Sequence, residues 1–482
     1  MRQPLFRAPL PLLSLLVCGC AAQTEPLRMD EIVPVLPANF VGASGDQQAE
    51  PVDEWWTRFG DPQLDAYVAR AIADNPSVLR AVARAEQARA AARIAQSELY
   101  PQVVGRFEAS RGEQNTATLG LGDALGDALP SSITSDRFTR TVNVSWEVDL
   151  WGRIGAQNNA ARADFLASAE NLRATRQSIA AQVSSAYFNV INARQQVAVS
   201  EDLVSAIAEI TRQVGNRADA GIASPNDKAL AIANLGQARA ALAQRREALR
   251  RAELGFGQLI RAYPDGEVAA AQSSPPLPPL PAAGLPASLI ERRPDIRAAE
   301  FSLQAAGYRL AAAQRSRLPA ISLTGAKGNS TNDIGSLFDP VSAIWNIAGS
   351  IVRPIFQGGR YRAQVDQADG ARDEAIETYA EIALRALTEV ETALAVEDLL
   401  AQRQAALGGA AIAARQSVDV SFNRYRSGLE PFVTVLESQQ RALEAGAAHL
   451  DATNARIENR IALHLALGGG FEDAPVSIEK DQ

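Results

Sequence analysis

Two spacings of apolar residues divide the chain into short and long segments. In residues 138–150 every second residue is apolar, and only Arg140 interrupts the apolar series. Residues 102–112 alternate in the same way, and residues 319–328 and 344–356 repeat the pattern less regularly. A period of two places apolar side chains on one face of a strand. The pattern predicts two strand pairs, at about 102–150 and about 319–356, each with an apolar and a polar face.

After Gly152 the spacing changes to three and four residues, which is typical of helices that pack side by side. Residues 153–214 contain no proline, and a helix of that length extends roughly 90 Å. Residues 360–426 predict a matching long helix. Each long helix is followed by a glycine-containing turn, and helices over 226–260 and 431–467 are expected to run back. The predicted contact positions of the first long helix are Ile179, Val183, Ala186, Val190, Ala193, Val197, Val204, Ile207 and Val214.

The two halves of the chain follow one plan. Pro76 corresponds to Pro294 and Gly152 to Gly359, each at the same place in its half. Such self-similarity indicates an internal duplication. A proline-rich stretch between the halves is unsuited to helix or central strand and predicts a connector. The predicted parts are a first repeat over 61–272, a linker over 273–286, a second repeat over 287–470 and a C-terminal tail over 471–482.

The predicted strand pairs are joined by long polar loops at one end and lead directly into helices at the other. Their length and alternation fit tilted transmembrane strands. Four strands cannot close a barrel, because single-chain barrels need at least about eight. Several chains must therefore share one barrel. The alternative is a soluble hairpin with its apolar face on a core.

The N-terminus resembles a bacterial lipoprotein signal. Arg2 and Arg7 precede a short apolar run over 8–17, and Cys18 and Cys20 follow as the only cysteines of the chain. The run is too short for a spanning helix. We expect a signal peptide over 1–19 and covalent diacylglycerol and N-acyl lipid on Cys20, followed by an extended segment over 20–60. An ordinary signal peptide with incidental cysteines is the alternative.

Composition narrows the function. The net charge of −8 argues against nucleic acid as a partner, and two histidines leave little for acid–base or metal chemistry. No nucleotide-binding or hydrolase motif is evident, so an enzyme is not expected, and no cofactor or metal is expected besides the lipid. A lipid-tethered coiled-coil scaffold is a second alternative. It explains the helices but not the amphipathic strands.

Six segments carry a family resemblance when taken in order within the duplicated frame. They are "WWTRFGDPQLDAYVARAIADNP", "VSWEVDLWGRI", "ERRPDIRAAEFSLQAA", "PIFQGGR", "ALTEVETAL" and "NRYRSGLEPFVTVLESQQ". The chain resembles the TolC-like outer-membrane efflux factors, most closely the OprM/NodT-type lipoprotein branch. The implied fold is mainly α with a membrane β-barrel: a homotrimeric 12-stranded β-barrel, four strands per chain, continuous with a long periplasmic α-helical coiled-coil barrel.

The resemblance also implies a function. The chain would be the exit duct of a tripartite efflux pump in the cell outer membrane, contacting outer-membrane lipids and extending into the periplasm. Its partners would be a periplasmic adaptor protein and an inner-membrane transporter of the resistance-nodulation-division type. Drugs or other small molecules would pass through passively. Conduits for type I protein secretion or for metal efflux are the alternatives within this class.

In this family, residues around the two helical turns keep the periplasmic end closed. Asp227 and Tyr425 occupy matching positions here. A nearby position that holds arginine in the type member is Glu430, so another cation is needed. The alternative is that Asp227 only caps its helix and Tyr425 only packs. The gate candidates are Asp227, Tyr425, Arg424, Asp419 and Phe422, with Arg217 and Arg426 as further sources of a cation.

Glu147 and Asp149 fall on the polar face of the second predicted strand, near its helical end. In a barrel this face lines the lumen, so both carboxylates are expected to face the channel. There they would tune ion preference or simply be solvated.

Overall fold

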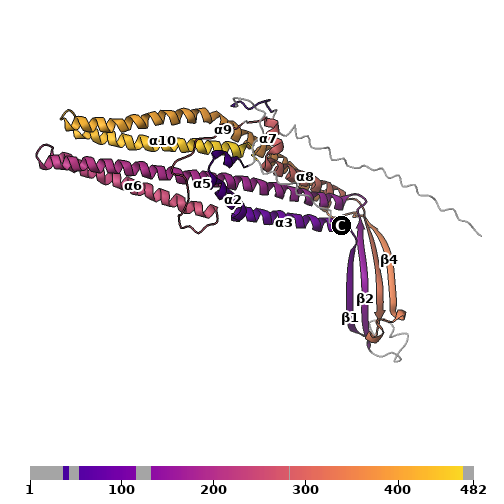
Figure 1. The fold of residues 1–482 in the computed structure, drawn as a ribbon. Coiled ribbons are helices and arrows are strands. Elements are labelled where there is room, and N and C mark those ends of the chain that lie inside the picture. The colour runs from indigo at the N-terminus through magenta and orange to yellow at the C-terminus, as the bar shows by residue number, and fades with distance from the viewer. Residues whose placement is uncertain (1–35, 43–53, 116–131, 282, 470–482) are drawn as a thin grey trace, which may run out of the picture.

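The computed structural model describes residues 36–42, 54–115, 132–281 and 283–469. These residues form an elongated molecule with four strands at one end and two helical turns at the other (Figure 1). The predicted signal peptide over 1–19, the lipid site Cys20 and the tail over 471–482 lie outside the described residues.

The strands form one antiparallel sheet in the order β1-β2-β3-β4. They are β1 (Gln102–Asn115), β2 (Ser132–Val148), β3 (Ala320–Thr331) and β4 (Ala343–Val352). The register sets Val103 opposite Val144, and Trp146 opposite Leu323, so apolar residues of neighbouring strands share one face. Many of these side chains are exposed in the single chain. The sheet has two open edges, β1 and β4.

The segment between β3 and β4 contains two short 3-10 helices, η4 (Ile334–Ser336) and η5 (Pro340–Ser342). Asn329, near the end of β3, donates hydrogen bonds to the Asp339 carbonyl (3.1 Å) and to the Ser342 hydroxyl (2.8 Å). This side chain therefore anchors the loop to the sheet.

The long helices are α5 (Arg153–Asp219) and α9 (Arg360–Arg426), each of 67 residues and therefore about 100 Å long. The return helices are α6 (Pro225–Leu259) and α10 (Phe432–Ala466), of 35 residues each. Of the predicted contact positions in α5, Ile179, Val183, Val190, Val197, Ile207 and Val214 are buried. No helix among the described residues is long and apolar enough to cross a membrane.

The first long helix continues past its predicted end at residue 214 to Asp219. Gly215, the residue after that predicted end, lies within the helix, although glycine costs a helix about 1 kcal/mol relative to alanine. In the structure Val214 is fully buried against the neighbouring helices of the turn region. That packing outweighs the propensity of one glycine.

Shorter helices complete each half. They are α2 (Pro62–Asp74) and α3 (Pro76–Ser97) in the first half, and α7 (Pro286–Arg292) and α8 (Pro294–Arg315) in the second. Near the strands α5 packs between α3 and α8, whereas toward the turns it packs between α6 and α10 (Figure 1). The long helices thus change neighbours at mid-length.

The largest apolar core lies at this mid-length region. Trp55, Phe59, Tyr187, Phe188 and Phe256 pack together there. The two N-terminal residues belong to η1 (Trp55–Phe59), a 3-10 helix, so this part of the segment predicted to be extended over 20–60 is helical. Burial of its aromatic side chains favours the compact turn over an extended chain.

The linker over 273–286 has no regular secondary structure in its described residues before α7 begins at Pro286. It is fixed to the helices by Arg460 of α10, whose guanidinium donates to the Pro278 carbonyl. The same guanidinium is paired with Glu397 of α9 at 2.8 Å, and both side chains are buried. The connector is therefore bound along the helical surface.

Candidate functional site

The two helical turns share one geometry at the end of the molecule opposite the strands (Figure 1). Gly221 and Gly428 have φ angles of 74° and 73°, in the left-handed region that favours glycine. In each turn the next amide closes the helix end: Ile222 N donates to Arg217 O at 2.8 Å, and Leu429 N to Arg424 O at 2.9 Å. The duplication therefore produces two similar hairpin tips, which we call the helical tip.

One side-chain hydrogen bond at the helical tip connects the predicted gate candidates. The Tyr425 hydroxyl donates to Asp227 Oδ2 at 3.2 Å. Tyr425 lies at the end of α9 and Asp227 at the start of α6, so the bond joins the α9/α10 hairpin to the α5/α6 hairpin. Ser224 caps α6 by accepting from the Asn226 amide at 3.1 Å. The side chain of Ser224 thus caps α6, whereas the side chain of Asp227 accepts a hydrogen bond from the other hairpin.

Tyr425 is held in place by aromatic and aliphatic neighbours. Only 7% of its surface is exposed. Its ring lies 5.1 Å from that of Phe432 and is stacked at 6.4 Å on that of Phe422. The Arg217 guanidinium lies 5.8 Å from the ring centre. Tyr425 therefore both packs against its aromatic neighbours and donates a hydrogen bond to Asp227.

Burial and the adjacent Asp227 carboxylate raise the pKa of Tyr425 above its usual value, and Arg217 only partly opposes them. The hydroxyl therefore stays protonated and can donate at neutral pH. Arg217, which was expected to offer a cation, contributes this nearby charge, and its buried Nε has no hydrogen-bond partner.

The other candidates make local contacts. Arg424 is paired with Glu430 at 2.5 Å across its own turn. Lys228 and Asp219 form the corresponding pair of the first turn at 2.6 Å. Both pairs are substantially exposed, and such pairs contribute little to stability.

The remaining candidates, Asp419 and Arg426, are both exposed. Neither takes part in the Tyr425–Asp227 hydrogen bond.

A further bond between the hairpins, near the helical tip, was not expected from the sequence. Asn234 of α6 donates to Gln439 Oε1 of α10 at 2.7 Å. Neither amide stands out in the local pattern, since polar residues are frequent on both helices. Only the three-dimensional alignment of the hairpins reveals this pair.

The two carboxylates at the helical end of β2 have protein partners. Glu147 is paired with Arg153 at 2.7 Å. Asp149 accepts from the amides of Ile154 (3.0 Å) and Gly155 (2.6 Å), in the first turn of α5. A carboxylate at a helix N-terminus is favoured by the helix dipole and satisfies unpaired amides. Asp149 therefore stabilises the junction between strand and helix.

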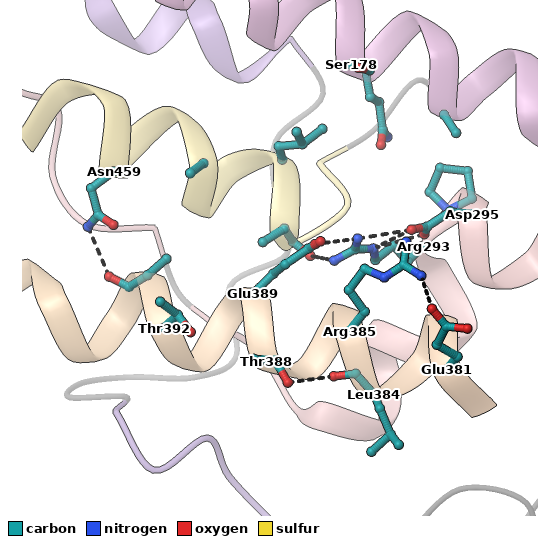
Figure 2. Close-up of a pocket in the computed structure, with 17 residues that line it drawn as sticks. Ser178, Arg293, Asp295, Glu381, Leu384, Arg385, Thr388, Glu389, Thr392 and Asn459 are labelled. Carbon is teal, nitrogen blue, oxygen red and sulfur yellow. Dashed lines mark hydrogen bonds and ion pairs between the residues drawn. The ribbon is translucent and has the colours of Figure 1, made fainter. Parts of the chain in front are cut away.

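A cavity of about 860 Å³ lies where α5, α8, α9 and α10 meet. Figure 2 shows Arg293, Asp295 and Glu389 pointing toward one another at its edge. The Arg293 guanidinium lies 2.9 Å from Asp295 and 2.5 Å from Glu389, and it also donates to the Ala466 carbonyl at 3.1 Å. Burial opposes its charge, but the two carboxylates raise the pKa of Arg293 overall. This cluster ties α8 to α9 and α10 at mid-length.

Comparison with known proteins identifies the family. The profile of the outer membrane efflux protein family matches residues 67–260 and 285–469. The chain belongs to this family. The two matched ranges correspond to the two halves of the efflux protein described above.

Relatives of this efflux protein align along nearly its whole length. It is 30% identical to the outer membrane protein OprJ of Pseudomonas aeruginosa over 482 residues, covering 98% of each chain. It is 29% identical to the cation efflux system protein CusC of Escherichia coli strain K12, covering 86% of this chain and 88% of that one.

Solved structures of outer-membrane channels have the same fold. The outer-membrane channel OprN superposes with a TM-score of 0.81 at 25% identity, covering 91% of this chain and 97% of that chain. The open state of the MtrE outer membrane channel of Neisseria gonorrhoeae gives 0.79 at 27% identity, covering 91% and 96%. The predicted resemblance, fold class and outer-membrane location are confirmed.

The family assignment also bears on chemistry. The relatives of this efflux protein are named as channel and efflux proteins rather than as enzymes. Among the described residues no group of three or more His, Cys, Asp or Glu side chains is placed to hold a metal ion. The efflux protein is an outer-membrane efflux channel, and its cargo is a separate question.

Proposed function

We propose that three copies of the chain form the exit duct of a tripartite efflux pump. The open sheet edges β1 and β4 support this assembly, because unpaired strand edges are satisfied in a membrane only by closure. Three four-stranded sheets would close one 12-stranded barrel. The long helices would continue it as a helical barrel toward a periplasmic adaptor and an inner-membrane transporter of the resistance-nodulation-division type.

The duct is gated at the helical tip, with the Tyr425–Asp227 hydrogen bond as its lock. This bond carries the proposal because it joins the two hairpins that would have to separate for the tip to widen. A hydrogen bond to a charged group contributes about 1.5–3 kcal/mol. A symmetric trimer would contain it three times, so its loss would favour the open tip strongly.

The cargo is a small solute that moves passively. Relatives of similar identity are named for different exports: pyoverdine (29%), cations (29%) and solvents (30%). We propose drugs or other small organic molecules as the cargo, because the described residues offer no metal-ligating cluster. Metal efflux is the second candidate, supported by the similarity to CusC.

Conductance of the purified protein in planar bilayers tests the gate. Wild type is expected to conduct weakly, and Asp227→Ala or Tyr425→Phe to conduct several-fold more, because each removes the hydrogen bond that joins the two hairpins at their turns. Arg424→Gln is the matched control: it breaks an ion pair within one turn and should leave conductance unchanged. Wild-type conductance in both lock variants, or an equal rise in Arg424→Gln, would rule out this lock.

A further inference from the structure

Two positive charges interrupt the apolar face of the sheet at one level. Arg140 of β2 lies on the face that also carries Val142 and Val144, and Lys327 of β3 lies on the face that carries Leu323 and Gly325. The register joins these into a single face. In the proposed barrel this apolar face contacts lipid, and the opposite, polar face lines the lumen.

The two charges are close neighbours. In the register Arg140 lies opposite Asn329 and Val142 lies opposite Lys327. Lys327 is therefore two positions along β3 from the residue directly opposite Arg140. Such diagonal neighbours on adjacent strands are about 7–8 Å apart. Both charges thus lie within reach of one small anionic group.

Their height corresponds to the outer edge of the apolar band. Lys327 lies six residues from Ile321, which is about 20 Å along a strand. With a strand tilt of about 35–45° this is about 15 Å of height. Ile355 and Phe356, 99% and 87% exposed, extend the apolar surface beyond the helical end of β4. The apolar band of outer-membrane barrels is about 25 Å tall, so the two charges lie near its outward limit.

Aromatic side chains mark the same level. The Arg140 guanidinium lies 4.1 Å from the centre of the Phe338 ring, which is 70% exposed. Trp345, opposite Lys327 in register, is 75% exposed, and Phe107, opposite Arg140, is 62% exposed. Aromatic residues gather where barrels meet the headgroup region. This second observation independently places the two charges at the membrane interface.

The charges keep donors available for a ligand. Lys327 is exposed and, in the described part of the chain, has neither a hydrogen bond nor an ion pair. Arg140 donates one hydrogen bond, from one Nη to Asn329 Oδ1 at 3.0 Å, whereas its Nε is buried, so the Nη atoms are the donors that can face a ligand. Farther out on this face Asp136 is paired with Arg111 at 3.5 Å, so that acid is already compensated. The local charge available to a ligand is positive.

Energetics favours an anion at this level. A lysine or arginine facing lipid costs about 2–4 kcal/mol at the bilayer midplane and about 0–1 kcal/mol near the interface. An ionised phosphate there would form charge-assisted hydrogen bonds with both side chains. Phosphorylated headgroups are the anions present at that depth.

We propose that Arg140 and Lys327 bind the phosphate of a lipid in the outward leaflet of the outer membrane, namely lipopolysaccharide. The site rests on the proposed barrel, since only a closed barrel gives the strands a lipid-facing side. Phe338 and Trp345 flank the phosphate and contact the adjoining acyl chains.

Native mass spectrometry of the detergent-extracted protein tests this site by counting bound lipid. Wild type is expected to retain added lipopolysaccharide, and the double variant Arg140→Gln/Lys327→Gln to bind it at least tenfold more weakly. Lys327→Gln alone is expected to weaken binding without touching the Arg140–Asn329 bond. The charge-conserving pair Arg140→Lys/Lys327→Arg should retain the lipid.

Arg137→Gln is the matched control. Arg137 lies farther out along β2 and on the lumen side, opposite Ser110 in register, and its loss should leave lipid binding unchanged. Wild-type retention by the double variant would overturn the site. So would equal binding of dephosphorylated lipid, or of phosphatidylglycerol in place of lipopolysaccharide.

Bilayer conductance of the same samples separates this site from the proposed function. Wild type that retains lipopolysaccharide through Lys327 but does not conduct would contradict the channel and support the lipid site. A conducting wild type whose lipid binding is unaffected by Lys327→Gln would support the channel and overturn the lipid site.

Discussion

Among the described residues, the Tyr425–Asp227 and Asn234–Gln439 hydrogen bonds join the two hairpins at or near the helical tip. The Tyr425–Asp227 bond has a carboxylate as acceptor, whereas the Asn234–Gln439 bond joins two neutral amides. Bonds to charged groups contribute about 1.5–3 kcal/mol and neutral ones about 0.5–1.5 kcal/mol. At the scale of single residues, the Tyr425–Asp227 bond is therefore the stronger of these two connections.

The raised pKa of Tyr425 predicts how the tip responds to alkali. Because burial and Asp227 raise this pKa above 10, the hydroxyl donates throughout the neutral range. The stabilisation is complete below about pH 10 and is lost as the pH rises through the raised value. Wild-type conductance should therefore be higher in strong alkali, above the raised pKa, than at neutral pH. Tyr425→Phe should conduct more at the lower pH and lack this increase; an equal alkaline rise in the variant would exclude Tyr425 as its source.

His464 predicts a loss of stability in acid. Burial, together with Arg58 and Arg460, lowers its pKa from 6.5 to about 3. Its ring stacks on Trp55 at 5.3 Å, and its Nε2 has no hydrogen-bond partner. The unfolded chain binds the proton more readily, so stability should decline as the pH falls from about 6.5 toward 3.

The temperature at which the assembly dissociates, compared at about pH 7.5 and pH 5, measures this effect. His464→Phe can keep the contact with Trp55 but cannot be protonated. It should therefore lose less thermal stability than wild type on acidification. A loss as large as that of wild type would show that other groups cause the acid sensitivity.

At the scale of elements, strands and helices differ in how fully the sequence determines them. Strict alternation from residue 138 onward predicted part of β2, but β2 begins at Ser132 because its outer residues pair with β1 beyond the apolar band. The span of α9 follows from the helical spacing of its apolar residues and from Gly359 and Gly428, which lie just outside its two ends. The end of α5 depended on packing around Val214, which local pattern does not reveal.

The β2–β3 contact predicts a sharp difference between two glycines of β3. A Cβ at Gly328 would lie 1.9 Å from the Arg140 carbonyl oxygen, whereas at Gly325 the nearest atom lies 3.8 Å away. Overpacking of this kind typically costs about 1–3 kcal/mol. Gly328→Ala should lower the dissociation temperature and the yield of the assembly, and Gly325→Ala, the matched control, should not. Equal stability of the two variants would contradict the register described for β2 and β3.

At the scale of the whole molecule, the duplication explains much of the predictable architecture. Corresponding glycines placed both turns at one end, and the resemblance pointed to Asp227 and Tyr425 before their contact was known. The partners of Glu147 and Asp149 were missed because Arg153 and the amides of α5 approach them only once the chain bends at Gly152. The mid-length cluster around Arg293 brings together α8, α9 and α10, and sequence spacing alone does not show which helices meet there.

The predicted lipid on Cys20 has a testable role in the assembly. Each buried CH₂ of a lipid chain contributes about 0.8 kcal/mol to membrane binding. An inserted barrel buries far more apolar surface, so the lipid should aid targeting more than retention. Cys20→Ala, secreted with a different signal peptide, should still yield some inserted trimers in outer-membrane fractions. A complete absence of inserted trimers would show that assembly requires the lipid.

The subunit count of the detergent-extracted particle tests the central claim most directly. The claim is that the four-stranded sheet is one third of a membrane channel whose β1 and β4 edges pair with those of identical chains. Native mass spectrometry should find three copies of the mature chain in one particle, and that particle should conduct ions in a planar bilayer. A stable single-chain particle that conducts nothing would contradict the account.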